Sequence, residues 1–196
     1  MRIGIMGGSF DPPHFSHKAI IDFCLKRKLV DEVWVCPVFD HLQKNHVASF
    51  EDRMYMSKML FSKWYSSKVE VLDEEKFNPR GYSLRLVRKF QRRFPRYQFK
   101  MIVGLDCAND IKSWYEWRTL LKTAPFIVIN RGFAIPKKSW FDKEPHEFYT
   151  VSDCFTSSTM VRKLCKEKHW QSVKNCTGSK VMKYIQKENL YADYTR

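Results

Sequence analysis

The sequence predicts an α/β fold, with a doubly wound and mainly parallel sheet followed by closing C-terminal helices. Short apolar runs rich in β-branched residues alternate with longer segments of helical periodicity along most of the chain. Such alternation favours parallel strands joined by right-handed crossovers. A length of 196 residues suits one domain, 1–196, in which 158–196 forms a helical C-terminal part.

Strand and helix signals alternate in the first part of the chain. Ile3–Met6 is a short apolar run that predicts a strand, and His17–Lys28 has the periodicity of a helix. Glu32–Pro37 is apolar and β-branched, which predicts a second strand. Ser49–Ser62 opens with the capping-box pattern S-F-E-D and carries an apolar helical stripe. Val69–Leu72 is a further short strand candidate.

The rest of the chain continues the alternation. Ser83–Phe94 predicts a helix that stops near Pro95, because the residue before a proline disfavours helical backbone. Phe126–Asn130 is the clearest buried strand. The other predicted elements are a strand over Gln98–Val103, a helix over Trp114–Lys122, a surface loop over Gly132–Glu147, a short strand over Phe148–Val151, and closing helices over Ser158–Lys168 and Lys180–Glu188.

A formal net charge of +14 raises the question of a nucleic-acid partner. The sharpest basic run lies between Arg85 and Arg96, and at helical spacing its cations fall mostly opposite apolar residues. We favour the solvated face of an amphipathic helix over a nucleic-acid surface, because no recognition motif accompanies the charge. An excess of positive charge also suits an enzyme with polyphosphate substrates.

The cysteines indicate the redox state of the protein's compartment, and the apolar runs indicate whether the chain could bind a membrane. No C-x-x-C pair occurs among the six cysteines, so a structural zinc site is not expected. Cys24, Cys36 and Cys165 sit in apolar patterns and are predicted to be buried. We expect a reducing, cytoplasmic location and no membrane partner, since no apolar run approaches the roughly 20 residues of a membrane span. The sequence leaves formation of a homo-oligomer open.

The stretch G-G-S-F-D-P-P-H-F-S-H, from Gly7 to His17, joins the first predicted strand to the first predicted helix. Glycines let a ligand approach the backbone closely, and a helix N-terminus offers free N–H groups to an anion. His14 and His17 lie three residues apart, which puts both rings on one side of the turn. H-x-x-H alone is a weak zinc signal, whereas paired imidazoles suit a phosphate chain. Alternatively, one histidine caps the helix and the other packs.

A second candidate phosphate site is T-S-S-T-M-V-R, from Thr156 to Arg162, which follows a predicted strand and opens a predicted helix. Hydroxyls and free N–H groups would face an anion there, with Arg162 about one turn further on as a bidentate partner. Taken alone, an ordinary Ser/Thr cap with a surface arginine is the favoured interpretation of this segment.

These two motifs together, in this order, resemble the nucleotidylyltransferase superfamily, and more closely its bacterial-type nicotinate/nicotinamide mononucleotide adenylyltransferases. The resemblance extends along most of the chain. Softer matches are Cys36-Pro37 followed by Lys44, Arg53-Met54, Gly104-x-Asp106, Trp114-Tyr115-Glu116-Trp117, and Arg131-Gly132-Phe133.

The resemblance implies a Rossmann-like nucleotidylyltransferase fold and adenylyl transfer from ATP to nicotinamide or nicotinate mononucleotide. The products would be NAD or its deamido form and pyrophosphate, with Mg²⁺ as cofactor and no covalent enzyme intermediate. By the same resemblance, the catalytic residues would be His14 and His17. The ATP-binding residues would be Gly7, Gly8, Ser9, Phe10, His14, His17, Lys44, Gly104, Asp106, Ser157, Ser158 and Arg162, and the mononucleotide-binding residues Ser83, Trp114, Tyr115 and Arg131.

The chain departs from that family pattern at three positions. Ser16 replaces the glycine usual in H-x-G-H, Ser83 stands for the usual threonine of the pyridine site, and Lys44 lies in H-L-Q-K. Ser83 therefore leaves the choice between amide and acid open. The alternative functions are a pantetheine-phosphate adenylyltransferase, a cytidylyltransferase, or a basic nucleic-acid-binding module that uses the Arg85–Arg96 helix.

Overall fold

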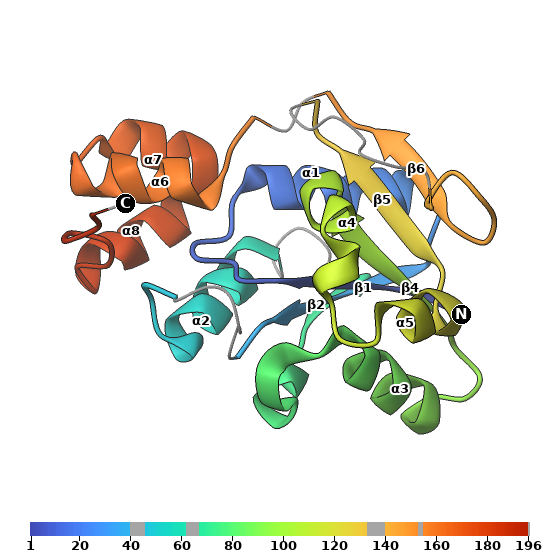
Figure 1. Ribbon diagram of the computed structural model, residues 1–196. Coiled ribbons are helices and arrows are strands. Elements are labelled where there is room, and N and C mark those ends of the chain that lie inside the picture. Colours follow the sequence, from blue (N-terminus) through green and yellow to red (C-terminus); the bar gives the residue numbers. More distant parts are fainter. Residues whose placement is uncertain (40–45, 62–66, 133–139, 153–154, 196) are drawn as a thin grey trace.

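A six-stranded sheet in which every pairing is parallel forms the centre of the molecule, with strand order β3-β2-β1-β4-β5-β6. The computed structural model describes residues 1–39, 46–61, 67–132, 140–152 and 155–195 (Figure 1). The order reverses at β1, where the chain moves from one half of the sheet to the other. This is the doubly wound, Rossmann-like arrangement that the alternating sequence predicts, and ligands bind at the carboxyl edge of such sheets.

The strands and the longer helices follow the predicted elements closely. The strands are β1 (Arg2–Gly8), β2 (Glu32–Pro37), β3 (Val69–Val71), β4 (Gln98–Gly104), β5 (Phe126–Asn130) and β6 (Glu147–Thr150). The helices are α1 (Phe15–Lys26), α2 (Phe50–Phe61), α3 (Ser83–Arg93), α4 (Leu105–Asn109), α5 (Trp117–Thr123), α6 (Ser158–Lys166), α7 (Trp170–Thr177) and α8 (Ser179–Lys187). Three short 3-10 turns are η1 (Glu74–Phe77), η2 (Pro79–Gly81) and η3 (Ile111–Ser113).

Alternating side chains of the strands build a separate hydrophobic core on each face of the sheet. Along β2, Val33 and Val35 face one core, whereas Trp34 and Cys36 face the other. The first core also takes side chains from α1, α2 and the three C-terminal helices, and the second from α3, α4 and α5. Strands buried on both faces explain why the sequence shows short, continuous apolar runs.

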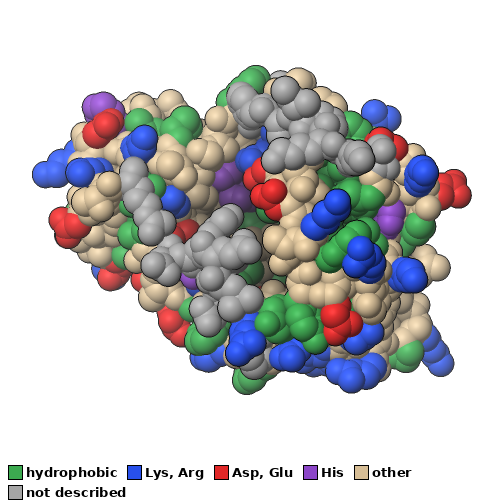
Figure 2. All heavy atoms as spheres, viewed as in Figure 1, with side chains coloured by type: hydrophobic (Ala, Val, Ile, Leu, Met, Phe, Trp, Pro, Cys, Tyr) green, Lys and Arg blue, Asp and Glu red, His purple; other side chains and the backbone are tan. Residues whose placement is uncertain are grey.

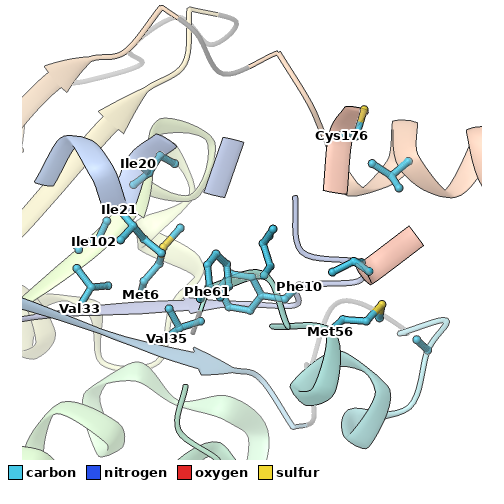
Figure 3. Packing of buried hydrophobic residues seen from close by; sticks show 14 of the residues in the cluster. Met6, Phe10, Ile20, Ile21, Val33, Val35, Met56, Phe61, Ile102 and Cys176 are labelled. Carbon is cyan, nitrogen blue, oxygen red and sulfur yellow. The ribbon is translucent and has the colours of Figure 1, made fainter. Parts of the chain in front are cut away.

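The first core reaches the carboxyl end of β1. Figure 3 shows Phe10, just beyond that strand, lying beside Phe61 of α2 and near Met6. The Phe10 and Phe61 rings meet edge to face at 6.0 Å. Cys176 of α7 belongs to the same cluster, so the C-terminal helices share a core with the sheet.

The C-terminal helices lie beyond the carboxyl ends of the strands, at the left of Figure 1. Each packs on the next, and α8 also packs on α2. Tyr184 of α8 donates a hydrogen bond of 2.7 Å to Asp52 of α2, and its ring contacts Tyr55. This placement brings the start of α6 to the edge of the sheet where α1 begins.

Several predicted boundaries were wrong. The helix predicted from Trp114 begins at Trp117, because Glu116 has left-handed backbone with φ 46° and ψ 43°. Helices α4 and α7 were not predicted from the sequence. The predicted surface loop over Gly132–Glu147 contains Phe141, which is only 1% exposed and belongs to the second core.

Other expectations are confirmed in the described part of the chain. Cys24, Cys36 and Cys165 are buried and free. Ser49 caps α2 by accepting the Asp52 N–H at 3.0 Å, as the capping-box pattern predicts. Among the described residues, the helices are all too short or too polar to cross a bilayer.

Candidate active site

The two segments singled out in the sequence, Gly7–His17 and Thr156–Arg162, are hydrogen-bonded to each other at the carboxyl edge of the sheet. The Thr156 N–H donates to Ser16 Oγ at 3.0 Å, and Ser158 Oγ donates to the Pro12 carbonyl at 2.9 Å. Ser16, which replaces the usual glycine, thus supplies one of the bonds between the segments. Their pairing forms a single site with two walls.

Asp11 is buried between these walls and accepts hydrogen bonds from several parts of the chain. Its carboxylate accepts hydrogen bonds from the Val47 N–H at 2.7 Å, the Ala48 N–H at 3.2 Å and the Tyr191 hydroxyl at 2.8 Å. Its carbonyl accepts a bond of 2.6 Å from Arg162 Nη1. A carboxylate that is 3% exposed but accepts several donors has its charge compensated, and it fixes the turn.

The two histidine rings stack on each other at the start of α1, with centroids 3.8 Å apart and planes inclined by 29°. His17 Nδ1 accepts the His14 backbone N–H at 3.2 Å, so the neutral ring of His17 carries its proton on Nε2. His14 is 1% exposed, and its Nδ1 has no hydrogen-bond partner among the described residues. His17 closes the helix N-terminus, as the alternative interpretation holds, while keeping a donor for a ligand.

Both histidines are neutral near pH 7. Burial lowers the pKa of His17 to about 3, and the positive charge of Arg131 acts in the same direction. Burial also lowers the pKa of His14 well below its usual value, with smaller contributions from His17 and Arg131. A phosphate would oppose these shifts, because a negative charge favours the imidazolium form.

The two glycines before the histidines differ in their surroundings, because Gly7 faces open space and Gly8 packs against a ring. A Cβ at Gly7 would meet no atom within 4 Å, whereas one at Gly8 would meet the Phe10 ring at 3.2 Å. The Phe10 side chain is buried and contacts the His17 ring, with centroids 4.8 Å apart. Gly7 therefore offers open backbone to a ligand, and the Phe10 side chain supports the His17 ring.

A buried cation holds the same turn from α2. Arg53 is 1% exposed and donates from Nη1 to the Ser9 carbonyl at 2.8 Å. Burial lowers the pKa of Arg53, and the nearby Asp11 opposes that shift. The Ser9 carbonyl is thereby engaged, which leaves the N–H groups and the side chain of the turn for a ligand.

The second wall is the start of α6. Ser157 is the N-cap of this helix, and its hydroxyl accepts the Met160 N–H at 3.2 Å. The uncapped N–H groups of the first turn can receive an anion. Arg162, one turn further on, donates to Asp11 and also to Thr159 Oγ1 at 3.2 Å.

A third group of predicted site residues lies at the ends of β4 and β5. Asp106 and Arg131 face each other at 3.7 Å between carboxylate and guanidinium. A Cβ at Gly104 would overlap the Asp106 carboxylate, so a side chain at this position would displace that carboxylate. Asp106 is exposed, which suits a group that contacts a ribose hydroxyl.

The residues predicted for the mononucleotide lie at the start of α3 and just before α5. Ser83 is the first residue of α3, and Trp114 packs partly against the second core. The rings of Tyr82 and Tyr115 stack with centroids 4.2 Å apart and planes inclined by 18°. Arg85 lies over both rings, at 5.0 Å from Tyr82 and 5.8 Å from Tyr115.

Figure 2 shows histidine side chains in the hollow between the C-terminal helices and the rest of the molecule, with lysines and arginines along the lower edge. Arg85, Arg88 and Arg92 of the basic run are exposed on α3, while Leu84, Val87 and Phe90 are buried. The amphipathic face predicted from the sequence is confirmed. Lys44, a predicted ATP contact, lies outside the described residues.

Several residues that support the site were not predicted from the sequence. Asp11 lies inside the first motif, and its acidic side chain among glycines and prolines was a usable signal. Tyr191 and Tyr194 carried no signal, because they reach the site only through the packing of the C-terminal helices. The missed residues are Asp11, Tyr82, Arg85, Tyr191 and Tyr194.

Comparison with known proteins identifies relatives of nearly the same length. A family model described as cytidylyltransferase-like matches residues 5–164. A nicotinate-nucleotide adenylyltransferase from Bacillus subtilis (strain 168) is 31% identical over 193 residues, covering 97% of this chain and 98% of the relative. A probable nicotinate-nucleotide adenylyltransferase from Albidiferax ferrireducens is 31% identical over 144 residues, covering 73% and 72%.

Solved structures give the same result. The nicotinic acid mononucleotide adenylyltransferase of Plasmodium falciparum complexed with NaAD superposes with a TM-score of 0.86 at 28% identity, covering 99% of this chain and 98% of that one. The same enzyme complexed with APC gives a TM-score of 0.83 with the same coverage.

Proposed function

This chain belongs to the nicotinate-nucleotide adenylyltransferases within the cytidylyltransferase-like family, and we propose that it prefers nicotinate over nicotinamide mononucleotide. It is a nucleotidyltransferase of NAD biosynthesis that transfers the adenylyl group of ATP to a pyridine mononucleotide. A phosphate oxygen of the mononucleotide bonds to the α-phosphorus of ATP. The bond from that phosphorus to the bridging oxygen breaks, and pyrophosphate leaves with the electron pair.

The observation that carries the ATP part of the proposal is the hydrogen-bonded pair of walls around two neutral histidines. The triphosphate would lie between the Gly7–His17 turn and the start of α6, where N–H groups, Ser157, Ser158 and Arg162 converge. The Nε2–H of His17 would donate to a phosphate oxygen and donate more strongly as charge develops in the transition state. Nucleotidyl transfer needs this positioning more than covalent chemistry.

Preference for the acid rests on the charge at the start of α3. The guanidinium of Arg85 lies over the stacked rings of Tyr82 and Tyr115. The family resemblance assigns Ser83 and the Tyr115 backbone to the pyridine substituent. A positive charge there favours a carboxylate over a neutral amide. The named relatives, which are nicotinate-nucleotide and nicotinic acid mononucleotide adenylyltransferases, support the same choice.

Mg²⁺ fits this site as a companion of the triphosphate. Among the described residues, His, Cys, Asp and Glu side chains nowhere gather in a group of three that could hold a metal ion. The metal would therefore be held by phosphate oxygens, and when bound it would neutralise charge on the leaving pyrophosphate. The chain's own residues orient the phosphates and shield the reacting atoms from water.

The described cysteines support a reducing, cytoplasmic setting as part of the proposal. Cys24, Cys36, Cys165 and Cys176 are buried thiols outside any disulfide, and burial raises the pKa of Cys24 and of Cys165 to about 12. Buried thiols of this kind are inert and need no oxidising compartment.

A substrate comparison tests the proposal. Purified protein is incubated with ATP, Mg²⁺ and one of four acceptors, namely nicotinate mononucleotide, nicotinamide mononucleotide, phosphopantetheine or, with CTP, a cytidylyl acceptor. We expect pyrophosphate and deamido-NAD, with kcat/KM for the nicotinate substrate at least about tenfold above that for nicotinamide, a difference of about 1.4 kcal/mol.

Equal or reversed preference between the two pyridine substrates would overturn the acid preference alone. Absence of product with either would overturn the proposed chemistry. Salt-sensitive binding of random duplex DNA without turnover would favour a nucleic-acid-binding module.

A further inference from the structure

The last described residues of the chain reach back to the phosphate site through Arg162. Nη2 of Arg162 donates to the Tyr194 hydroxyl at 3.2 Å, and the guanidinium carbon lies 4.6 Å from the centre of the Tyr194 ring. Nη1 donates to the Asp11 carbonyl at 2.6 Å. The guanidinium is therefore held between a ring and hydroxyl from the C-terminus and a carbonyl from the first turn.

Tyr194 is itself anchored. It is 6% exposed, and its backbone N–H donates to the Tyr191 carbonyl at 3.3 Å. Tyr191 is 3% exposed, and its hydroxyl donates to the Asp11 carboxylate. Both tyrosines belong to the first core. The C-terminal segment thus makes two contacts as one packed unit. Tyr191 contacts the first turn, and Tyr194 contacts Arg162.

The described part of the chain leaves some donors of the Arg162 guanidinium without a partner. An arginine has five N–H donors, and the bonds to Asp11, Thr159 and Tyr194 use three of them. Nε is buried and has no partner among the described residues. A buried cationic donor without a partner beside a helix N-terminus is what a phosphate oxygen would satisfy.

We propose that Tyr194 is a positioning residue for ATP, which holds the Arg162 guanidinium ready for the β- and γ-phosphates before the nucleotide arrives. This rests on the proposed function, which places the triphosphate between the two walls. An arginine side chain that moves freely loses rotamer freedom when it binds a ligand, and that loss weakens binding. Contacts that fix the side chain beforehand remove that cost, so Tyr194 favours ATP binding without touching it.

The test is steady-state kinetics on the full chain, with Tyr194→Phe as the central variant. This variant keeps the ring over the guanidinium and removes only the hydroxyl acceptor. We expect KM for ATP to rise about fivefold, the effect of one lost hydrogen bond of about 1 kcal/mol, while KM for nicotinate mononucleotide stays unchanged. Tyr194→Leu, which also removes the ring, should raise KM for ATP further.

Tyr184→Phe is the matched control. Its hydroxyl also makes a hydrogen bond from the C-terminal helices, but to Asp52 of α2 instead of Arg162. We expect this variant to leave both KM values at the wild-type level. A similar rise in KM for ATP in Tyr184→Phe would show that Tyr194 acts only through general stability, which would overturn the proposal.

A double-mutant cycle with Arg162→Ala separates the positioning role of Tyr194 from the phosphate-binding role of Arg162. If Tyr194 acts through Arg162, adding Tyr194→Phe to Arg162→Ala should cause no further rise in KM for ATP. Additive effects would overturn the positioning role. A rise with Arg162→Ala but not with Tyr194→Phe would do the same and leave the proposed function intact. If Arg162→Ala itself leaves KM for ATP unchanged, the phosphate site assigned to it falls, and the role of Tyr194 falls with it.

Discussion

The ATP side and the pyridine side of the candidate active site are built on different principles. On the ATP side, His14 and Asp11 are 1% and 3% exposed, and hydrogen bonds connect the first turn to α6 and to the C-terminus. On the pyridine side, Tyr115 is 41% exposed, and stacked rings with an overlying arginine form the surface. One side is fixed by buried polar contacts and the other is open.

This difference follows from what each substrate needs. Charge that develops on phosphates is stabilised best by donors that are already in place and shielded from water. A flat pyridine ring needs a face to stack on and one charge to select its substituent, and both work at the surface. We therefore expect changes on the ATP side to lower turnover or ATP affinity, and changes on the pyridine side to alter substrate preference.

The largest effect is expected from His17→Ala, on the ATP side. It removes the Nε2–H that we propose donates to the phosphate under attack, so kcat should fall by at least about 100-fold. Single-turnover formation of the dinucleotide, with both substrates saturating, measures the change. His169→Ala serves as control, because His169 is exposed and pairs with Glu167. Wild-type turnover in His17→Ala would show that the histidine is not a catalytic donor.

Ser16→Ala probes the connection between the two walls. It deletes the acceptor of the Thr156 N–H, and one such bond contributes about 1 kcal/mol. We expect KM for ATP to rise about fivefold with a smaller change in kcat, since the walls are less firmly held before ATP binds. Ser172→Ala, at an exposed position on α7, is the control. An unchanged KM for ATP would show that the Ser16 bond does not organise the site.

Arg85→Gln tests the pyridine side. It removes the charge over the Tyr82–Tyr115 rings, and the ratio of kcat/KM for nicotinate to that for nicotinamide mononucleotide should fall about threefold to fivefold. The effect should weaken with added salt, because exposed charges are screened. Arg88→Gln, exposed on the same helix, should retain the wild-type ratio. An equal loss for both substrates would indicate a structural role for Arg85.

The smallest expected effect is a dependence of stability on pH, which runs in opposite directions for Glu75 near the pyridine side and His17 on the ATP side. Burial raises the pKa of Glu75 to about 7, and this carboxyl accepts a hydrogen bond from Asn78, which also donates to the Tyr82 carbonyl. Because its folded pKa lies above the ordinary 4.5, Glu75 destabilises the fold progressively as pH rises from about 4.5 to about 7. His17, with a pKa lowered from 6.5 to about 3, destabilises it as pH falls below 6.5.

Glu75→Gln should therefore differ least from the wild type at pH 4 and exceed its free energy of unfolding by at least about 1 kcal/mol at pH 8. Chemical denaturation at the two pH values measures this difference. Glu70→Gln, on an exposed position of β3, should show no such pH dependence. The same difference between Glu75→Gln and wild type at both pH values would contradict the raised pKa.

Local patterns were sufficient for much of the fold. Glu32–Pro37 and Phe126–Asn130 are strands with the predicted bounds, because strands buried on both faces show as short apolar runs with β-branched residues. The helix predicted from Trp114 was wrong in its first turn, because the left-handed backbone of Glu116 has no clear sequence signal. Short helices such as α4 were also not predicted, since five residues are too few to show a helical periodicity.

The sequence by itself determined the alternating fold, the two candidate phosphate-binding segments and the histidine pair, because each depends on residue types at short spacing. Only the tertiary structure decided that Ser16 and Thr156 join the segments, and that Tyr194 holds Arg162. Those contacts connect residues 140 and 32 positions apart. Such contacts arise from how the C-terminal helices pack on the shared core, which no local pattern encodes.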